Sequence, residues 1–278
     1  MLAATATLAA LAAAVPNPCH DPALALRCPD LVMAPPSHLR VERSPSRRHV
    51  VLRMENRIVN IGAGPAELFG RRISLTEMRA QQVVVDAAGR RRRIATEAEL
   101  YFKSVPSRGG SYWKFHNAAR FELWAIDATG HRTRLVRTGP KHDYCLRDLD
   151  RVRDGPTVRR DRFFGACNQG ADTREITLGT SVGWADVYPS TYPDNWIEVT
   201  GLRGCFAVVH RADPGNGIWE SNEANNVGST IVRLPYKPGP QRCPKVQPVP
   251  PAPPVPTPPP PPPAPAPLPP PPTPPPTV

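Results

Sequence analysis

The C-terminal end of the chain is a proline tract that cannot contribute to a folded core. From Pro248 to Val278, 21 of the 31 residues are proline. Proline has a fixed φ angle and no amide hydrogen, so such a tract forms a polyproline II helix, rising about 3.1 Å per residue without internal hydrogen bonds. We therefore expect residues 237–278 to be a low-complexity, disordered tail that acts as a spacer or stalk. A ligand for proline-binding domains is the alternative.

The N-terminal end has the pattern of an export signal. The segment from Leu2 to Val15 is apolar and contains the small-residue cleavage pattern Ala12-Ala13-Ala14. It is too short for a transmembrane helix, which needs about 20 residues, and no other apolar run reaches that length. Because no Lys or Arg stands near Met1, an ordinary alanine-rich helix is the alternative. We predict a signal peptide over 1–18, a linker over 19–27, no transmembrane span, and a protein that is secreted or associated with the cell wall.

The cysteines favour disulfide bonds. The sequence contains six of them without a Cys-x-x-Cys pair, at Cys19, Cys28, Cys145, Cys167, Cys205 and Cys243. An even number, wide spacing and an export signal are typical of disulfides rather than of a zinc site. Six cysteines can pair in many ways, and the residues alone do not choose among them.

The segment between the two ends has the pattern of β-strands. Apolar and polar residues alternate over His49 to Gly62, and Gln81 to Phe102 has the pattern of strand, turn and strand around Gly89. A hairpin is expected over Phe121 to Gly139, with its turn at Asp127 to Gly130. Further strands are expected within 195–214 and 226–236. Because no long helical period is present, we predict an all-β fold, an antiparallel β-sandwich-like single domain over 28–236.

Positive charge is in excess, with 35 Lys and Arg against 24 Asp and Glu. The run Arg90 to Arg93 would suggest nucleic acid in an intracellular protein, but it follows the turn-forming residues Ala87-Ala88-Gly89. A solvated hairpin tip is therefore the preferred interpretation. For an exported protein the expected partners are anionic cell-wall polymers or acidic protein surfaces, and no nucleic acid is expected.

A glycine pair follows the first long strand, at Gly62 and Gly64. It lacks the third glycine of a dinucleotide-binding motif, Pro65 comes directly after it, and no helical pattern follows that could receive a phosphate. We predict a β-turn here and no nucleotide site.

Six segments occur in an order that resembles the lysyl oxidase family. They are CPDLVMAPP from Cys28, LRMENRIVNIGAGPAEL from Leu52, SYWKFHNAARFEL from Ser111, GPKHDYCLRDLD from Gly139, GWADVYPSTYPDNWIEVTGL from Gly183 and ESNEANN from Glu220. The resemblance extends over roughly Cys28 to Tyr236. It depends on the ordered set, including the spacing from Tyr188 to Trp196, rather than on one motif.

The resemblance implies a copper-dependent oxidoreductase that acts on CH–NH2 donors with oxygen as acceptor, of the protein-lysine oxidase type. Family members convert the ε-amine of protein lysine side chains to an aldehyde and release ammonia and hydrogen peroxide. Their cofactor, lysyl tyrosylquinone, forms when copper and dioxygen oxidise a tyrosine and a lysine amine adds to its ring. The matching precursors are Lys141, four residues before Cys145, and Tyr188, eight before Trp196. A phenol can be oxidised to a quinone, and a primary amine is a nucleophile towards it.

The copper motif of the family is degenerate in this chain. The resemblance places three histidines, spaced His-x-His-aromatic-His, before the strand Ala118 to Leu123. Aligning Trp113 with the family's aromatic puts these positions on Gly110, Tyr112 and Lys114, and a shift by two residues puts them on Tyr112, Lys114 and His116. Neither register contains more than one histidine, although Cu(II) prefers imidazole nitrogen. We expect an inactive or chemically altered family member, with a non-catalytic binding or structural module of the cell surface as the alternative.

Two residues of this segment allow more than one interpretation. His116 could meet His142 across strands to form part of a metal site, but a histidine hydrogen-bonded to water or backbone is the default. Lys114 could place a cation where copper would lie, or it could point outward. The sequence does not decide between these alternatives.

The resemblance also implies a calcium site, which is better preserved than the copper site. The matching residues are Asp30, the backbone of Leu31, Glu220, Asn222, Asn225 and Asn226. These are the hard oxygen ligands that calcium prefers, although Asn222 replaces a carboxylate. A turn rich in Asn and Glu without an ion is the alternative. For the disulfides, the resemblance favours Cys145 with Cys167, and chain order suggests Cys19 with Cys28 and Cys205 with Cys243.

Overall fold

Antiparallel β-strands dominate the computed structural model, which describes residues 15–43, 49–105, 110–140 and 142–247. The described residues all belong to one compact unit, Met1–Pro248. A second unit, Val249–Val278, lies outside the described residues, and so does most of the predicted signal peptide. Helical structure in the described part consists of short 3-10 turns: η1 (Pro18–His20), η2 (Pro22–Leu24) and η4 (Glu223–Asn225). None of these helices has the length or apolar composition that crossing a membrane requires. The predicted all-β fold is confirmed.

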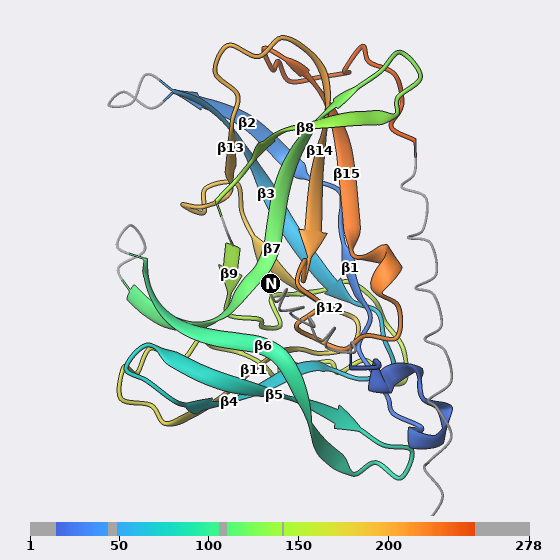
Figure 1. Ribbon diagram of the computed structural model, residues 1–278, viewed down its shortest axis with the longest axis vertical. Helices are drawn as coiled ribbons and strands as arrows, with labels where there is room; N and C mark the ends of the chain where they lie inside the picture. Colours follow the sequence, from blue (N-terminus) through green and yellow to red (C-terminus); the bar gives the residue numbers. More distant parts are fainter. Residues whose placement is uncertain (1–14, 44–48, 106–109, 141, 248–278) are drawn as a thin grey trace, which may run out of the picture. The chain divides into compact units, whose positions relative to one another are not determined.

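The strands of the described residues form two sheets (Figure 1). In the larger sheet seven strands run in the order β11-β4-β5-β6-β7-β14-β15, and β8 and β9 also pair with β7. Its members are β4 (Ala66–Arg72), β5 (Glu77–Val85), β6 (Arg91–Val105), β7 (Gly110–Ile126), β8 (Arg132–Thr138), β9 (His142–Tyr144), β11 (Glu175–Thr180), β14 (Gly204–Ala212) and β15 (Val227–Leu234).

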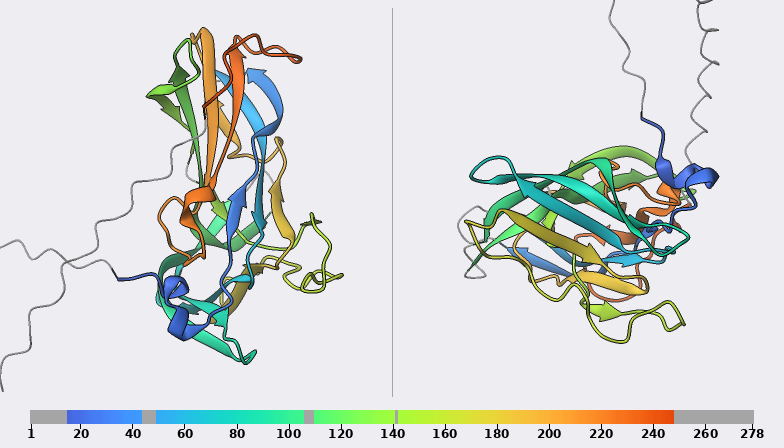
Figure 2. Two further views of the ribbon diagram at one scale, coloured as in Figure 1. Left: turned by 90° about the vertical axis from the view of Figure 1, so that its right-hand side faces the viewer. Right: turned by 90° about the horizontal axis from the view of Figure 1, so that it is seen from below.

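The smaller sheet is built around β3. Strands β1, β3, β12 and β10 follow one another, and β2 and β13 also pair with β3. Its members are β1 (Leu31–Met33), β2 (Ser37–Arg43), β3 (Val50–Asn60), β10 (Asp150–Arg151), β12 (Trp184–Tyr188) and β13 (Trp196–Glu198). In the left view of Figure 2 the upper parts of the two sheets are seen edge-on, with β14 and β15 facing β2 and β3.

The local patterns of the sequence correspond to these strands. Alternate residues of β3 are buried from Leu52 to Asn60, as the alternation of apolar and polar residues predicts. The expected turn of the β7–β8 hairpin is also present, because the N–H of Gly130 donates to the carbonyl of Asp127 at 3.1 Å and Gly130 has a φ of 88°. Strands β13, β14 and β15 lie in the segments where strands are expected.

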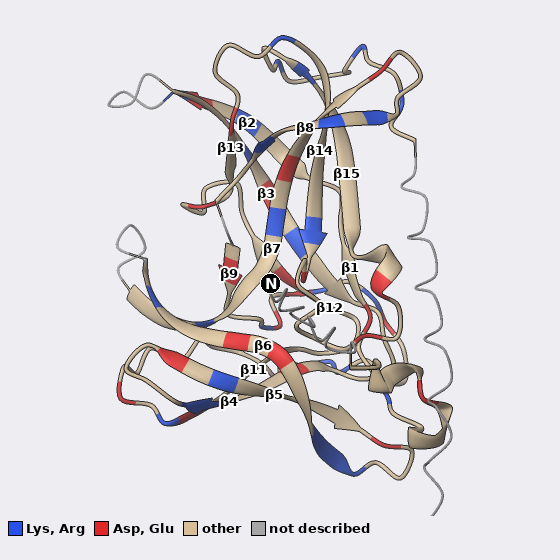
Figure 3. Cartoon of the chain, viewed as in Figure 1, with Lys and Arg blue, Asp and Glu red and all other residues tan. Residues whose placement is uncertain are grey.

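The predicted hairpin tip around Gly89 is confirmed, and its arginines are paired. Arg90 and Arg92 both donate to the Asp86 carboxylate, at 2.9 and 3.0 Å, and the guanidinium of Arg93 lies 3.5 Å from the ring centre of Phe69. Arg91 pairs with Glu67. The basic start of β6, at the bottom of Figure 3, is therefore a set of local ion pairs on a hairpin.

Gly62 and Gly64 lie in a bend that packs against the chain before β1. The N–H groups of Ala63 and Gly64 both donate to the carbonyl of Cys28, at 2.9 and 3.0 Å. A Cβ on Gly64 would lie 2.0 Å from the carbonyl oxygen of Arg27, so this position requires glycine because of close backbone contact.

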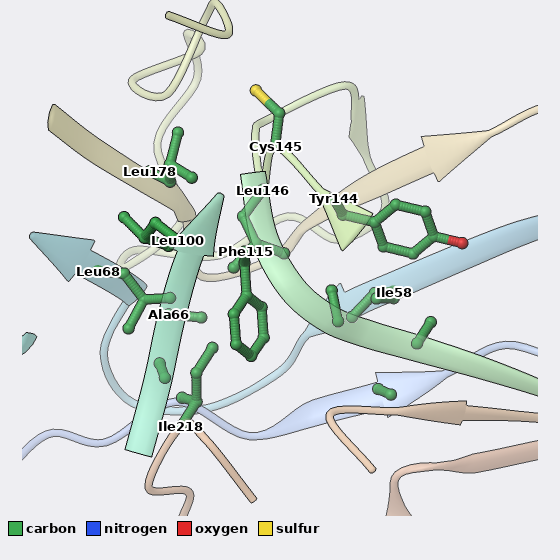
Figure 4. Packing of buried hydrophobic residues seen from close by; sticks show 14 of the residues in the cluster. Ile58, Ala66, Leu68, Leu100, Phe115, Tyr144, Cys145, Leu146, Leu178 and Ile218 are labelled. Carbon is green, nitrogen blue, oxygen red and sulfur yellow. The ribbon is translucent and has the colours of Figure 1, made fainter. Parts of the chain in front are cut away.

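Strand β7 bends and contributes to two hydrophobic clusters. Its first half pairs with β6, and its second half pairs with β14 and β8. Phe115 belongs to a first cluster, called the lower cluster, together with Leu68, Leu100 and Tyr144. Figure 4 shows the Phe115 ring at the centre of that packing. Phe121 belongs to a second cluster, called the upper cluster, together with Leu52, Ile197, Val208 and Val232.

Asn117 marks the bend. It adopts a φ of 54°, in the left-handed region, and its N–H donates to Oδ1 of Asp143 at 2.9 Å. The pairing of β7 with β9 shifts register between Phe115 and Ala119. An irregular residue inside a long strand re-aims the side chains on either side of it, so the two halves of β7 present their side chains to different clusters.

All six cysteines are paired. The disulfides are Cys19–Cys28, Cys145–Cys167 and Cys205–Cys243, as expected from the resemblance for the second and from chain order for the others. Three disulfides in a domain of this size are compatible with an extracellular, oxidising environment.

Candidate functional site

A cavity of about 610 Å³ lies between β7, β12 and the loop that follows β9. Its volume falls in the range of small-molecule sites. Three tyrosines, two cations and a disulfide contribute to its wall: Tyr112, Tyr188, Tyr192, Lys114, Arg147 and Cys145–Cys167.

Lys114 is the buried cation of this wall. Only 2% of the residue is exposed, and its Nζ donates a hydrogen bond of 2.6 Å to the hydroxyl of Tyr192. Burial, helped by the charge of nearby Lys103, lowers the pKa of Lys114 to about 8, because a desolvated ammonium is disfavoured. The alternative that Lys114 points outward is therefore wrong: the side chain is buried, and the residue is part of the cavity wall.

Tyr188 lies at the base of the same wall, at the end of β12. Its ring stacks on Tyr144 at 3.9 Å between centroids, and Tyr192 packs edge-on against it at 4.7 Å. The backbone N–H of Cys145 donates to the Tyr188 hydroxyl at 3.0 Å. Burial raises the pKa of Tyr188 well above its usual value, so this phenol remains protonated.

Asp186 is a fully buried carboxyl two residues before Tyr188. Burial raises its pKa to about 8, although the guanidinium of Arg147 favours the charged form. Burial therefore favours the neutral form of this carboxyl, which weakens its ability to balance the formal charges of Lys114 and Arg147.

His116 lies outside the cavity. Its Nδ1 contacts Oδ1 of Asp143 at 2.9 Å, and its ring packs on Tyr101 at 4.6 Å. The side chain is 32% exposed. Of the positions assigned to copper by the resemblance, Tyr112 and Lys114 reach the cavity wall and His116 does not.

The structure does not bring His116 and His142 together. His142 is completely buried against Phe121, at 3.9 Å between ring centroids, whereas its neighbour Asp143 contacts His116. Successive residues of a strand point to opposite faces, so the two histidines lie on opposite sides of β9. Within the described residues, no three His, Cys, Asp or Glu side chains are grouped as metal ligands.

The donor set of the pocket does not fit copper. Cu(II) prefers imidazole, but the wall offers three phenols, an amine hydrogen-bonded to one of them, Tyr192, and a guanidinium. An ammonium repels a dication, and Gly110 of the first register has no side chain. Lys141, the expected quinone precursor, lies outside the described residues; β9, which follows it directly, carries the Tyr144 that stacks on Tyr188.

The residues expected to hold calcium lie close together, near η4 and the start of β1. The Glu220 carboxylate accepts from the N–H of Leu31 and, at 2.8 Å, from the amide of Asn226. Nδ2 of Asn225 donates to Asp30 at 2.8 Å. Asn222 instead caps η4, because its side chain accepts from the N–H of Ala224 at 3.0 Å.

Several oxygens in this cluster have no hydrogen-bond partner among the described residues. They are Oδ1 of Asn225, Oδ1 of Asn226 and Oε2 of Glu223. Burial raises the pKa of Glu220 to about 9. Buried oxygens without donors are the ligand type that a hard cation such as calcium prefers, although the described acidic side chains do not form a metal-ligand group by themselves.

The sequence did not single out several residues of these sites. Tyr192, Arg147 and Asp186 at the pocket and Glu223 at the calcium cluster become apparent only from their contacts. Tyr112 and Lys114 could have been associated from their spacing of two residues along an expected strand, which puts their side chains on one face. Tyr192 lies in a loop, and no periodic pattern indicates where its hydroxyl points.

The fold and the site define a disulfide-bonded all-β domain with a cavity lined by tyrosines and a buried lysine. No family model matches the chain, and no curated protein is significantly similar to it.

Proposed function

We propose that this protein is a secreted or cell-wall-associated, lysyl-oxidase-like module that has no oxidase activity and binds an anionic ligand in the Lys114 pocket. The alternative, a copper amine oxidase with Lys141 and Tyr188 as quinone precursors, is the activity of the family that the sequence resembles. The first proposal is favoured by the chemistry of the pocket wall.

The observation that carries this proposal is the position of Lys114. Its amine lies 2.6 Å from the Tyr192 hydroxyl on the wall of the cavity that also contains Tyr188. In both alignments with the family's copper motif, position 114 should be a copper-binding histidine. A lysine amine there supplies a hydrogen-bond donor and a positive charge.

The charge of the wall also bears on the ligand. An amine oxidase must accept the cationic side chain of a substrate lysine, whereas Lys114 and Arg147 both repel a cation. The same two groups favour a carboxylate or another anion. Anionic cell-wall polymers are therefore favoured as partners over protein lysine side chains.

Copper and quinone analysis tests this proposal directly. The purified full chain is incubated aerobically with Cu(II), dialysed, and analysed for bound metal, quinone staining and peroxide release with amine substrates. We expect less than one copper per ten chains, no stain and no peroxide. One copper per chain with quinone staining and peroxide release would contradict the proposal.

A binding measurement tests whether the protein binds an anionic ligand in the Lys114 pocket. Polygalacturonate serves as an anionic polymer, and calorimetric titration is compared for the wild type and Lys114→Met. We expect binding by the wild type and at least tenfold weaker binding by the variant. Arg40→Met, on an exposed part of β2, is the matched control and should bind as the wild type does. Equal binding by all three proteins would place the polymer elsewhere.

A second candidate role is a calcium-stabilised link between the start and end of the domain. Asp30, Glu220, Glu223, Asn225 and Asn226 would hold the ion, which would supply charge neutralisation for buried carboxylates. The observation that favours this role is that Oδ1 of Asn225, Oδ1 of Asn226 and Oε2 of Glu223 are buried and accept no hydrogen bond from the described residues.

A further inference from the structure

Lys114 differs in its surroundings from the other lysines that the structure describes. The sequence has only five: Lys103, Lys114, Lys141, Lys237 and Lys245. Lys237 and Lys245 are exposed, and Lys141 lies outside the described residues. Among the four described lysines, only Lys114 is both buried and on the wall of the cavity.

Lys103 shows what an ion-paired lysine looks like in the same region. Its Nζ lies 3.1 Å from Asp143 and 3.5 Å from Asp194. Burial opposes its charge, yet these two carboxylates raise the pKa of Lys103, and the ammonium form is retained. Lys114 has a tyrosine hydroxyl as its hydrogen-bond partner, and its pKa is lowered by burial. A larger fraction of its amine is therefore unprotonated near neutral pH, which is the nucleophilic form.

We infer that the pocket captures an aldehyde that carries a carboxylate, by forming an imine with the Lys114 amine. The reactive nitrogen is buried on the wall of a 610 Å³ cavity, beside the Tyr192 hydroxyl, and Arg147 on the same wall provides a partner for the carboxylate. This ligand class rests on the proposed function, because it requires a pocket that binds anions and contains no copper.

The reaction balances without an oxidant or reductant. The lone pair of the Lys114 nitrogen attacks the aldehyde carbon, and the carbonyl oxygen takes up a proton to give a carbinolamine. The carbon–oxygen bond then breaks, a carbon–nitrogen double bond forms, and one water leaves. The Tyr192 hydroxyl, 2.6 Å from the nitrogen, is placed to donate the proton that the departing hydroxyl needs and to recover one from the nitrogen.

Two sources could supply such an aldehyde, and they share the same reactive group. One is a free oxo acid, for which glyoxylate is the probe. The other is the reducing end of an acidic polysaccharide, for which galacturonic acid is the probe. The cavity volume is compatible with either molecule, so comparison of the two probes identifies the source.

Reductive trapping tests the inference in the wild-type full chain. The protein is incubated with each probe and cyanoborohydride at pH 8, cleaved after arginine, and the five lysines are followed by mass spectrometry. We expect Lys114 to be modified at least tenfold faster than exposed Lys237, which serves as the control within the same molecule. For each probe the rate at Lys114 is divided by the rate at Lys237, which removes the different intrinsic reactivities of the two aldehydes. A larger ratio for galacturonic acid would indicate the polysaccharide source, and a larger ratio for glyoxylate would indicate the oxo acid.

Two further variants separate the imine from general reactivity. Tyr192→Phe should slow trapping at Lys114 at least threefold while leaving Lys237 unchanged, and Arg147→Met should reduce the preference of Lys114 for glyoxylate over the neutral aldehyde propanal. Equal rates at Lys114 and Lys237 in the wild type, or no adduct at Lys114 with either probe, would overturn the inference. A copper-free chain with unmodified Lys114 would refute only this ligand class, whereas a copper-loaded chain with oxidase activity would refute the proposed function itself.

Discussion

Lys114 Nζ donates a hydrogen bond of 2.6 Å to the Tyr192 hydroxyl, and this contact connects β7 to the loop that follows β12. It places a lysine amine on a cavity wall that otherwise consists largely of tyrosines, a disulfide and an arginine. The protonation state of Lys114 therefore affects both the stability of the domain and the chemistry of its pocket.

Replacing Lys114 with methionine should stabilise the domain at pH 7 by on the order of 1 kcal/mol, because it removes the desolvation cost of a buried ammonium, which exceeds the gain from the hydrogen bond to Tyr192. The pKa of Lys114 is about 8 in the folded protein and 10.5 in the reference state. Between these values the unfolded chain binds more protons at this site, so wild-type stability should rise with pH relative to the variant. Urea unfolding at pH 7 and pH 10 measures the difference.

The other ionisable groups around Lys114 are present in both proteins, so their own titration, including that of Asp186 near pH 8, is common to the wild type and the variant. These groups are Lys103, Asp143, Asp186 and Asp194, which influence the Lys114 amine from β6, β9, β12 and the loop after β12. The control is Lys103→Met, which removes a lysine from the same region but breaks ion pairs and should destabilise the domain. A pH-independent difference between wild type and Lys114→Met would contradict the low pKa.

His142 and His210 should make the domain sensitive to acid. Both are fully buried, both pack on Phe121 at 3.9 Å, and their ring nitrogens have no hydrogen-bond partner among the described residues. Burial lowers the pKa of His142 to about 3 and that of His210 well below 6.5. Below pH 6.5 the unfolded chain binds protons that the folded chain excludes, so stability should fall from pH 6.5 towards pH 3.

Denaturant unfolding between pH 7 and pH 4 measures this loss. His142→Phe and His210→Phe should each reduce the slope of stability against pH in that range. His131→Gln, at an exposed site in the β7–β8 turn, should leave the slope unchanged. If both phenylalanine variants kept the wild-type slope, the acid sensitivity would have another origin.

Asn117 should tolerate glycine but not a β-branched residue. Its φ of 54° lies in a region that glycine enters freely and that valine avoids. We expect Asn117→Val to lower the free energy of unfolding by about 1–2 kcal/mol and Asn117→Gly to change it by less than about 1 kcal/mol. Thermal or urea unfolding compares the two variants, and equal destabilisation by both would argue against backbone strain as the cause.

Calcium should raise the melting temperature if the Glu220 cluster binds it. We expect an increase of several degrees between EDTA and millimolar calcium in the wild type, because the ion binds the folded state only. Glu220→Gln should lose most of the increase, since it removes the central carboxylate. The control is Glu97→Gln at an exposed position of β6, which should retain the full shift. No shift in the wild type would refute the calcium candidate.

The strands and turns were predictable because their signals are local. Alternation in β3, the Gly89 and Gly130 turns and the absence of a helical period each depend on neighbouring residues only. The bend of β7 was not predictable. It arises from the left-handed backbone conformation of Asn117, which is stabilised by a hydrogen bond from the Asn117 N–H to the Asp143 carboxylate. That contact joins residues far apart along the chain.

The candidate site was predictable only in part. The spacing of Tyr112 and Lys114 along a strand places both on one face, and the resemblance drew attention to Tyr188. Whether Lys114 faces the cavity or the solvent was left open, and the answer depends on Tyr192 and the loop that carries it. His116 was considered with His142, but the alternation of β9 sends them to opposite sides.

The sequence by itself determined that this protein is built from antiparallel strands between a proline-rich end and an apolar N-terminal segment, and that the expected copper position lacks its histidines. These properties depend on residue type and on short-range spacing. The tertiary structure decided the rest: it buried Lys114 beside Tyr192, kept the Tyr188 phenol protonated and paired the Arg90–Arg93 run with carboxylates and Phe69. Burial and charge pairing arise between residues distant in the chain, and they set protonation, reactivity and exposure.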